Sequence, residues 1–88
     1  MKIEISKKTL KFLNELQPKH AKQIAIKALS LAVEPRPIDS ATLKGRDDLL
    51  RVDSGEYRII YRIEEDMVKI IVIGKRNDVE VYKNLTFK

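Results

Sequence analysis

The sequence has no cysteine and a single histidine, His20, among its 88 residues. The lack of cysteine excludes disulfides, thiolate catalysis and cysteine-ligated metal sites, and it is compatible with a reducing cytosol. His20 stands beside lysines at the start of a predicted helix, where a solvated side chain is expected. One histidine on that element argues against a Ser-His-Asp triad and against a transition-metal site. We therefore predict a protein that uses no metal or other cofactor.

Glycine-rich phosphate loops and long apolar runs are also missing. Neither GxGxxG nor GxxxxGK followed by Ser or Thr occurs, which excludes the common nucleotide-phosphate loops. The first residues, MKIEISKK, contain no apolar signal region. No stretch approaches the roughly 18 apolar residues of a membrane span. These absences predict a cytoplasmic protein without a membrane partner.

What the chain does have is charge, with 18 Lys and Arg against 13 Asp and Glu, a net charge of +5 and a pI of about 9.6. This basic balance indicates a polyanionic partner. Residues 1–40 hold most of the excess, whereas residues 41–88 are nearly neutral in sum. The interest of the second half therefore lies in where its charges point. The length suits a single domain, residues 1–88, with one modest core.

The first part of the chain predicts a strand followed by two helices. Residues 2–5 alternate polar and apolar side chains, as a strand does. Ser6 suits the N-cap of a first helix, and Pro18 suits the first turn of a second one. The apolar stripe of the second helix comprises Ile24, Ala28 and Leu31, widened by Ala25, Leu29 and Ala32. The short connection predicts an antiparallel helix hairpin.

The rest of the chain predicts a loop and then strands. Residues 34–48 contain two prolines, which rule out a continued helix, and Gly45, which permits a turn. Strands are expected at 49–53, 57–64, 67–73 and 79–82. The predicted fold class is α+β: an antiparallel sheet of about four strands, with the N-terminal helix hairpin packed on one face.

Two turns set the expected register of this sheet. With Ser54 and Gly55 at the tip of the first hairpin, Arg51 lies directly opposite Arg58. Two like charges in such positions destabilise a sheet.

The second hairpin has its tip at residues 65–66, although Glu-Asp is not a favoured pair for a tight turn. In this register Arg62 lies opposite Lys69. Ile60 then lies opposite Ile71.

Alternation along the strands separates two faces. The face predicted to lie under the helices carries Leu50, Val52, Tyr57, Ile59, Tyr61, Ile63, Val68, Ile70 and Val72. The opposite face carries Arg51, Arg58, Arg62 and Lys69 among Leu49, Ile60, Ile71 and Ile73. We expect this second face to be a basic surface that no helix covers.

Two interpretations of the basic face remain open. Its arginines can be ordinary surface residues that pair with Asp53 and Glu56 on the same face. The opposition of Arg51 and Arg58, however, needs an anion or a carboxylate between the two side chains. A phosphodiester fits, because the planar guanidinium fork matches phosphate oxygens.

Several segments resemble the RelE/ParE toxin superfamily, and in particular its RelE-type members. They are LKG (43–45), LLRVDSGEYRIIYRI (49–63) and GKRNDVEVY (74–82), preceded by the helix hairpin. The resemblance implies an antiparallel sheet that carries a helix pair. It also implies cleavage of messenger RNA on the ribosome without a metal. In that reaction the ribose 2′-oxygen attacks the adjacent phosphate and leaves a cyclic phosphate and a 5′-hydroxyl.

The resemblance also implies roles for individual residues. Arg58 matches the arginine that stabilises charge on the phosphate, and Arg76 matches a second functional arginine. Tyr82 matches a tyrosine near the scissile bond, although a strand-end tyrosine is often a packing residue. Asp53 stands where the family often has a basic residue, and it is either a base or a sign of altered activity. The residues expected to bind RNA are Arg51, Lys44, Lys75 and Arg62.

The partners that the resemblance implies are a cognate antitoxin, the ribosome and its mRNA, with operator DNA bound only through the antitoxin. Two alternatives remain. One is a ParE-type toxin that inhibits DNA gyrase and performs no RNA chemistry. The other is a degenerate, binding-only toxin that acts with its antitoxin in operon repression.

Overall fold

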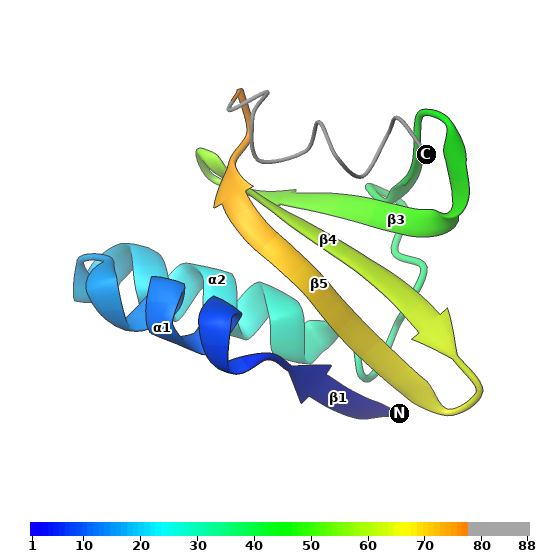
Figure 1. Cartoon of the computed structure of the whole chain (residues 1–88), viewed down its shortest axis with the longest axis horizontal. Helices are drawn as coiled ribbons and strands as arrows, with labels where there is room; N and C mark the ends of the chain where they lie inside the picture. The colour runs from blue at the N-terminus through cyan, green and yellow to red at the C-terminus, as the bar shows by residue number, and fades with distance from the viewer. Residues whose placement is uncertain (78–88) are drawn as a thin grey trace.

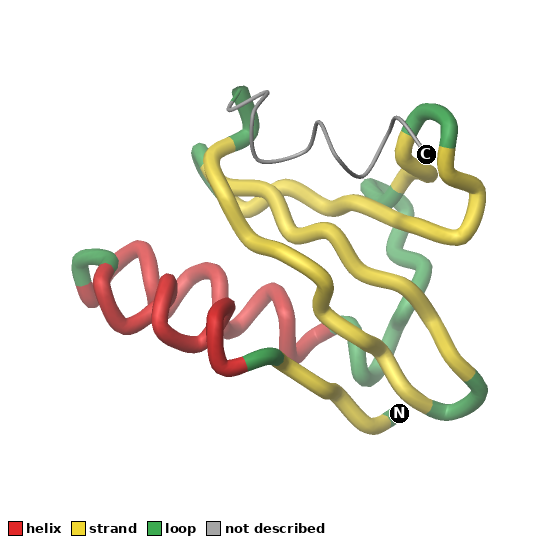
Figure 2. Tube along the Cα trace, viewed as in Figure 1, coloured by secondary structure: helices red, strands yellow, loops and turns green. Residues whose placement is uncertain are grey.

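The computed structural model describes residues 1–77, which form a five-stranded sheet with two helices on one side of it (Figures 1 and 2). The elements are β1 (Lys2–Ile5), α1 (Lys7–Glu15), α2 (Pro18–Ser30), β2 (Ala41–Leu43), β3 (Arg46–Ser54), β4 (Tyr57–Glu64) and β5 (Met67–Lys75). The strand order is β1-β5-β4-β3-β2. β1 is parallel to β5, and the other neighbours are antiparallel. The predicted α+β class is confirmed.

Two strand predictions need correction. β2 lies inside the stretch 34–48 that was expected to be a loop, and β3 begins at Arg46 rather than at residue 49. The sheet is also not wholly antiparallel, because β1 and β5 pair in the parallel direction. The strand expected at 79–82 lies outside the described residues.

Local signals place both helices correctly. The Ser6 side chain accepts a hydrogen bond from the Thr9 backbone N–H at 3.1 Å, and α2 begins at Pro18. The predicted stripe of Ile24, Ala28 and Leu31 is buried. Leu29 was expected to widen this stripe, but it is 63% exposed. The sheet therefore buries a narrower strip of α2 than the sequence suggested.

The helix-covered face of the sheet holds the main core. From the helices it receives Leu13, Ile24, Ala28 and Leu31; from the strands it receives Leu50, Val52, Tyr57, Ile59, Tyr61, Val68, Ile70 and Ile73. Burying these side chains stabilises the fold by roughly 25 cal/mol for each Å² of apolar surface removed from water. A smaller cluster lies on the second face, where Leu43, Leu49 and Ile60 are buried and Ile71 and Val72 pack against them.

A β-bulge changes the faces of the last part of β5. Tyr61 pairs with Ile70, but its neighbour Ile60 pairs with Val72, so one residue of β5 is left over between them. Beyond that point the alternation is reversed. Val72 therefore lies on the second face and Ile73 in the main core, the opposite of the prediction. The expected partner of Ile60 was wrong for the same reason.

The segment that links α2 to β2 is fastened to both layers. The Tyr61 hydroxyl donates a 2.7 Å hydrogen bond to the Pro35 carbonyl oxygen, and Lys27 of α2 makes a 2.8 Å ion pair with Asp39. Burial raises the pKa of Tyr61, so its hydroxyl keeps the proton that it donates. Two prolines stiffen the same segment.

The β4–β5 turn contains a backbone position that is unfavourable for its residue. Glu65 has φ 53°, in the left-handed region, which costs a non-glycine residue about 1–2 kcal/mol. We expect Glu65→Gly to raise the free energy of unfolding by about 0.5–1 kcal/mol, the strain relief less the entropy cost of glycine. Thermal melting measures the change. Glu65→Gln is the control, since it removes the charge but keeps the strain; an equal rise in both variants would contradict the prediction.

Candidate nucleic-acid interface

The β3–β4 hairpin determines which charged side chains meet on the second face. Ser54 pairs with Tyr57, so the two-residue tip is Gly55-Glu56, one position later than predicted. Gly55 has φ +60°, a conformation that glycine adopts easily as the first residue of such a tip. As a result, Arg58 lies opposite Asp53.

The predicted opposition of Arg51 and Arg58 is therefore wrong. Arg51 lies opposite Ile60. The observed register puts opposite charges, rather than like charges, next to each other, which favours this pairing.

Two guanidinium groups converge on the Asp53 carboxylate. Arg58 Nε donates a hydrogen bond to Asp53 Oδ1 at 3.0 Å, and Arg76 Nη1 lies 3.9 Å from Asp53 Oδ2. The Arg58 side chain is 21% exposed and that of Arg76 is 54% exposed. The Arg76 backbone N–H donates to the Glu56 carbonyl oxygen at 2.9 Å, which holds the end of β5 against the β3–β4 turn. We call Asp53, Arg58 and Arg76 the two-arginine site.

The chemistry of this site is that of an anion receptor. Guanidinium groups donate to carboxylate and phosphate oxygens with similar geometry. The charge-assisted hydrogen bond from Arg58 is partly buried, so solvent screens it less than a fully exposed ion pair. The anion now between the arginines is the protein's own Asp53. Sequence reasoning singled out Arg58 and Arg76 and offered Asp53 as a pairing partner for the arginines of this face, which the structure confirms. That one carboxylate lies between these two arginines could not be foreseen, because it depends on the register.

The other residues expected to bind RNA spread out from this site. Arg51 and Arg62 share its face, but Arg62 lies four residues along β4 from Arg58, a separation of about 13 Å. Arg62 makes an ion pair with Glu64. Lys44 is exposed in the β2–β3 turn, at the other end of β3 from Asp53. They could not all contact one phosphate.

The end of β5 adds a small hollow beside the two-arginine site. Glu56, Lys75, Arg76 and Asn77 line it, and its volume is about 90 Å³. Lys75 is exposed, but it pairs with Tyr57 of the helix-covered face, whereas Arg58 pairs with Gly74. Tyr82, the third predicted catalytic residue, lies outside the described residues.

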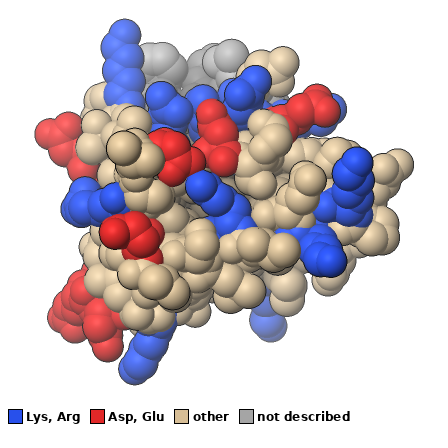
Figure 3. Space-filling view, turned by 180° about the vertical axis from the view of Figure 1, so that it is seen from behind, with Lys and Arg blue, Asp and Glu red and all other residues tan. Residues whose placement is uncertain are grey.

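The second face is not the bare basic surface that was expected. Its centre is apolar and buried, since Leu49 and Ile60 are almost inaccessible to solvent. On the side of the molecule that Figure 3 shows, seen from behind the view of Figure 1, Lys and Arg side chains lie among Asp and Glu side chains. Several cations of this face have acidic neighbours, for example Lys69 with Glu4 at 3.6 Å. Much of this face therefore agrees with the interpretation that its arginines are ordinary surface residues paired with acidic side chains.

Two further properties concern the described residues alone. Within residues 1–77, no group of three or more His, Cys, Asp or Glu side chains is placed to hold a metal ion. Across that same stretch, neither helix has the length and hydropathy required to traverse a membrane.

Residues 3–80 match the family described as "ParE toxin of type II toxin-antitoxin system, parDE". The chain belongs to the RelE/ParE toxin superfamily. Within this superfamily it is similar to the candidate toxin RelE1 of Methanocaldococcus jannaschii, with 36% identity over 86 residues, which cover 93% of this chain and 94% of that protein. This similarity makes it a RelE-type member.

Solved structures agree with this membership. RelE of the archaeal RelE–RelB complex from Pyrococcus horikoshii OT3 superposes with a TM-score of 0.75 and 28% identity, covering 88% of this chain and 96% of that one. The isolated E. coli RelE toxin superposes with a TM-score of 0.72 and 24% identity, covering 96% of this chain and 93% of that one. The second likeness concerns the fold alone.

Proposed function

We propose that this RelE-type toxin is a metal-free endoribonuclease that cuts messenger RNA on the cytoplasmic ribosome. The observation that carries the proposal is the convergence of Arg58 and Arg76 on one anion. The resemblance to RelE-type toxins assigns Arg58 to the charge on the phosphate and implies that Arg76 is a second functional arginine. Their meeting in space is independent support, since they lie on β4 and just beyond β5.

The reaction needs charge stabilisation more than a bound cofactor. The ribose 2′-oxygen forms a bond to phosphorus, the bond from phosphorus to the 5′-oxygen breaks, and a cyclic phosphate remains. The 2′-hydroxyl loses its proton to a base, and the leaving 5′-oxygen gains one. Negative charge grows on the non-bridging oxygens, where preorganised donors such as Arg58 can contribute about 3–4 kcal/mol. Tyr82 is proposed to act near the scissile bond.

The ribosome is proposed to align the RNA because, among the residues that the structure describes, few groups could activate the 2′-hydroxyl alone. His20, the one histidine of the chain, lies against the ring of Tyr57, with 5.6 Å between the ring centroids. Tyr57 belongs to the helix-covered face, whereas its neighbour Arg58 points to the second face. His20 is therefore on the wrong side of the sheet to serve as a base. Holding the 2′-oxygen in line is worth several kcal/mol, and the decoding site can supply that orientation.

We expect the purified protein to cut messenger RNA only when translating ribosomes are present. The test incubates a defined message with the protein alone and with programmed ribosomes, and it maps the 5′-hydroxyl ends. Cuts at defined codon positions in the second reaction alone support the proposal. Equal cutting in both reactions would contradict ribosome dependence. No cutting in either would favour a binding-only toxin.

A second candidate function follows from the family description, which names ParE. A ParE-type toxin would inhibit DNA gyrase without RNA chemistry. Gyrase-dependent DNA breaks without RNA cleavage would favour it. The similarity to RelE1 and the pair of Arg58 and Arg76 support the RelE-type activity instead.

We also propose a cognate antitoxin as protein partner, through which alone the toxin would contact operator DNA. Related toxins have been solved as complexes with RelB, from Pyrococcus horikoshii among others. On this chain, an apolar strip runs from α2 into the following segment. Its exposed members are Ile26, Leu29, Val33 and Ile38.

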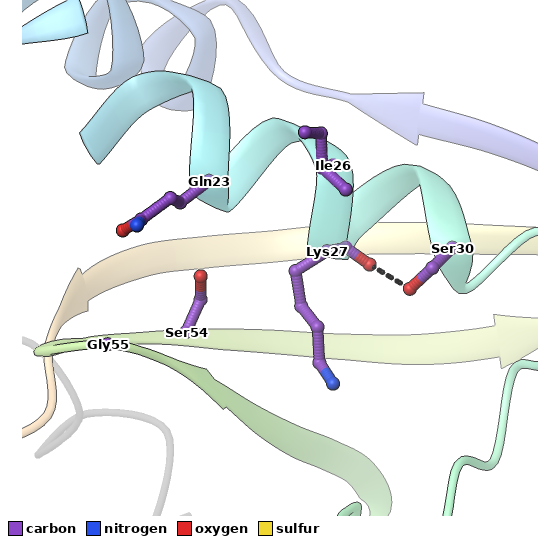
Figure 4. Close-up of a pocket in the computed structure, with 6 residues that line it drawn as sticks. All are labelled: Gln23, Ile26, Lys27, Ser30, Ser54 and Gly55. Atoms are coloured by element: carbon purple, nitrogen blue, oxygen red, sulfur yellow. Dashed lines mark hydrogen bonds between the residues drawn. The ribbon is translucent and has the colours of Figure 1, made fainter. Parts of the chain in front are cut away.

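A groove lies beside this strip. It has a volume of about 390 Å³ and is lined by Gln23, Ile26, Lys27, Ser30, Ser54 and Gly55. Figure 4 shows Gln23 and Lys27 reaching from α2 towards the β3–β4 hairpin, in which Ser54 ends β3 and Gly55 lies in the turn. An amphipathic helix of the antitoxin could lie along such a surface with its apolar side on the exposed strip.

A further inference from the structure

We propose that Asp53 is an internal substitute for the RNA phosphate, and that a phosphodiester enters the two-arginine site by displacing the Asp53 carboxylate. This inference rests on the proposed function, because it concerns how the same site is regulated. Both carboxylate oxygens face guanidinium groups: Oδ1 accepts from Arg58 Nε at 3.0 Å, and Oδ2 lies 3.9 Å from Arg76 Nη1. A phosphate between these arginines would need the same donors.

The geometry makes carboxylate and phosphate competitors rather than neighbours. Asp53 is fixed to the sheet by its pairing with Arg58, so its backbone cannot withdraw from the site. Its short side chain can rotate, and it is 34% exposed, which leaves room for the carboxylate to turn towards solvent. Even then, a negative charge within a few ångströms of the phosphate would weaken binding by simple repulsion. The Asp53 carboxylate therefore occupies the two-arginine site until RNA is held against it.

The same contacts argue against Asp53 as the base that activates the 2′-hydroxyl. A base must offer an oxygen lone pair to the hydroxyl proton. Both Asp53 oxygens already face cations, so a 2′-hydroxyl would have to compete with the arginines for them. The two roles predict opposite results for a neutral, isosteric replacement: loss of a base prevents proton transfer, whereas loss of a competitor frees the arginines.

The decisive experiment measures the affinity for a fluorescent 2′-O-methyl RNA oligonucleotide, which the protein can bind but cannot cut. Asp53→Asn removes the charge and keeps the shape. The matched control is Asp48→Asn, which removes a carboxylate charge from the same strand. Asp48 is also paired with an arginine, since its Oδ2 lies 2.9 Å from Arg46 Nη2. We expect Asp53→Asn to bind RNA more tightly than Asp48→Asn, by roughly fivefold at least, because only Asp53 lies beside the bound phosphate.

Inorganic phosphate serves as a competitor and should displace the oligonucleotide from Asp53→Asn at a lower concentration than from the control. Asp53→Ala, followed in the same assay, provides a second variant if the asparagine variant does not fold. An affinity of both Asp53 variants equal to that of Asp48→Asn would overturn the inference. So would weaker binding, which would mean that Asp53 organises the arginines for RNA.

Ribosomal cleavage by the wild-type protein is followed separately. If the wild type cuts no messenger RNA on ribosomes while Asp53→Asn still binds RNA more tightly than its control, the proposed function fails and the displacement stands. If the wild type cuts, and Asp53→Asn neither cuts nor binds more tightly than the control, Asp53 is a base and the displacement is refuted.

Discussion

Replacing Arg58 by alanine is expected to lower the rate of ribosome-dependent cleavage by about 10²–10³-fold, the usual effect of removing one preorganised donor to a developing oxyanion. Arg58 is the less exposed of the two arginines and makes the shorter contact to the anion in the site, so its loss should have the larger effect. Arg76→Ala is expected to reduce the rate less, because its exposed side chain is more fully screened by solvent. Single-turnover cleavage on programmed ribosomes measures both rates.

Folding must be separated from chemistry in this test. Arg58→Ala leaves the partly exposed Asp53 with Arg76 as a neighbour, so we expect the free energy of unfolding to fall by only about 1 kcal/mol. Arg46→Ala is a suitable control, because it removes another ion-paired arginine. Arg46 lies at the end of β3 that is distant from Asp53. Full activity in Arg58→Ala and Arg76→Ala would refute the site. Loss of the folded state would show that these arginines are structural.

The second large effect is expected at the antitoxin surface. The double variant Ile26→Asp with Leu29→Asp should weaken antitoxin binding by about 100-fold or more, because charges would replace apolar side chains that the partner desolvates. Ile26 is 58% exposed, and Leu29 is similarly accessible, so neither change removes a core contact. Binding is measured by calorimetry, and folding by thermal melting. Leu10→Asp on α1 makes the same kind of change at another exposed position and is the control.

The salt dependence of this binding tests the same idea. Exposed charges are screened within about 8 Å at physiological ionic strength, whereas apolar burial is not. We expect the affinity to change little between low and high salt. A steep loss with salt would indicate that acidic residues of the antitoxin act mainly on the cations of the toxin. Absence of any antitoxin partner would contradict the toxin assignment itself.

Much of this fold could be predicted because its signals are local. Ser6 and Pro18 mark helix starts by their own chemistry, and the spacing of Ile24, Ala28 and Leu31 identifies the buried side of α2. The face of each residue on β3 and β4 was also predictable. The observed pairing is displaced by two residues from the predicted one, and a shift of two keeps every side chain on its face.

The errors come from features that depend on contacts distant in the sequence. The bulge that moves Val72 and Ile73 to the opposite faces has no signature in those residues, since both are β-branched and apolar. The three-residue strand β2 exists because its backbone pairs with β3. The parallel pairing of β1 with β5 joins strands that lie far apart in the sequence. None of these can be read from periodicity.

The candidate site was predictable in its members but not in its geometry. Arg58 and Arg76 were identified by resemblance, and the structure places both beside Asp53. The two roles that the resemblance left open for Asp53, a base or a sign of altered activity, depended on sequence position alone. The displacement by two residues, caused by Gly55 taking the first place in the turn, decides which charge Arg58 meets.

The tethered segment between α2 and β2 bears on how quickly and tightly a partner could bind. Pro35 and Asp39 are each held by a hydrogen bond, and Ile38 stands fully exposed between these two anchors. Its backbone has therefore lost its conformational freedom on folding rather than on association. A partner that docks against Ile38 would meet a preorganised surface, which lowers the entropy cost of forming the complex. Tyr61→Phe would remove the hydrogen bond to the Pro35 carbonyl oxygen, so that the segment would have to become ordered when the partner binds.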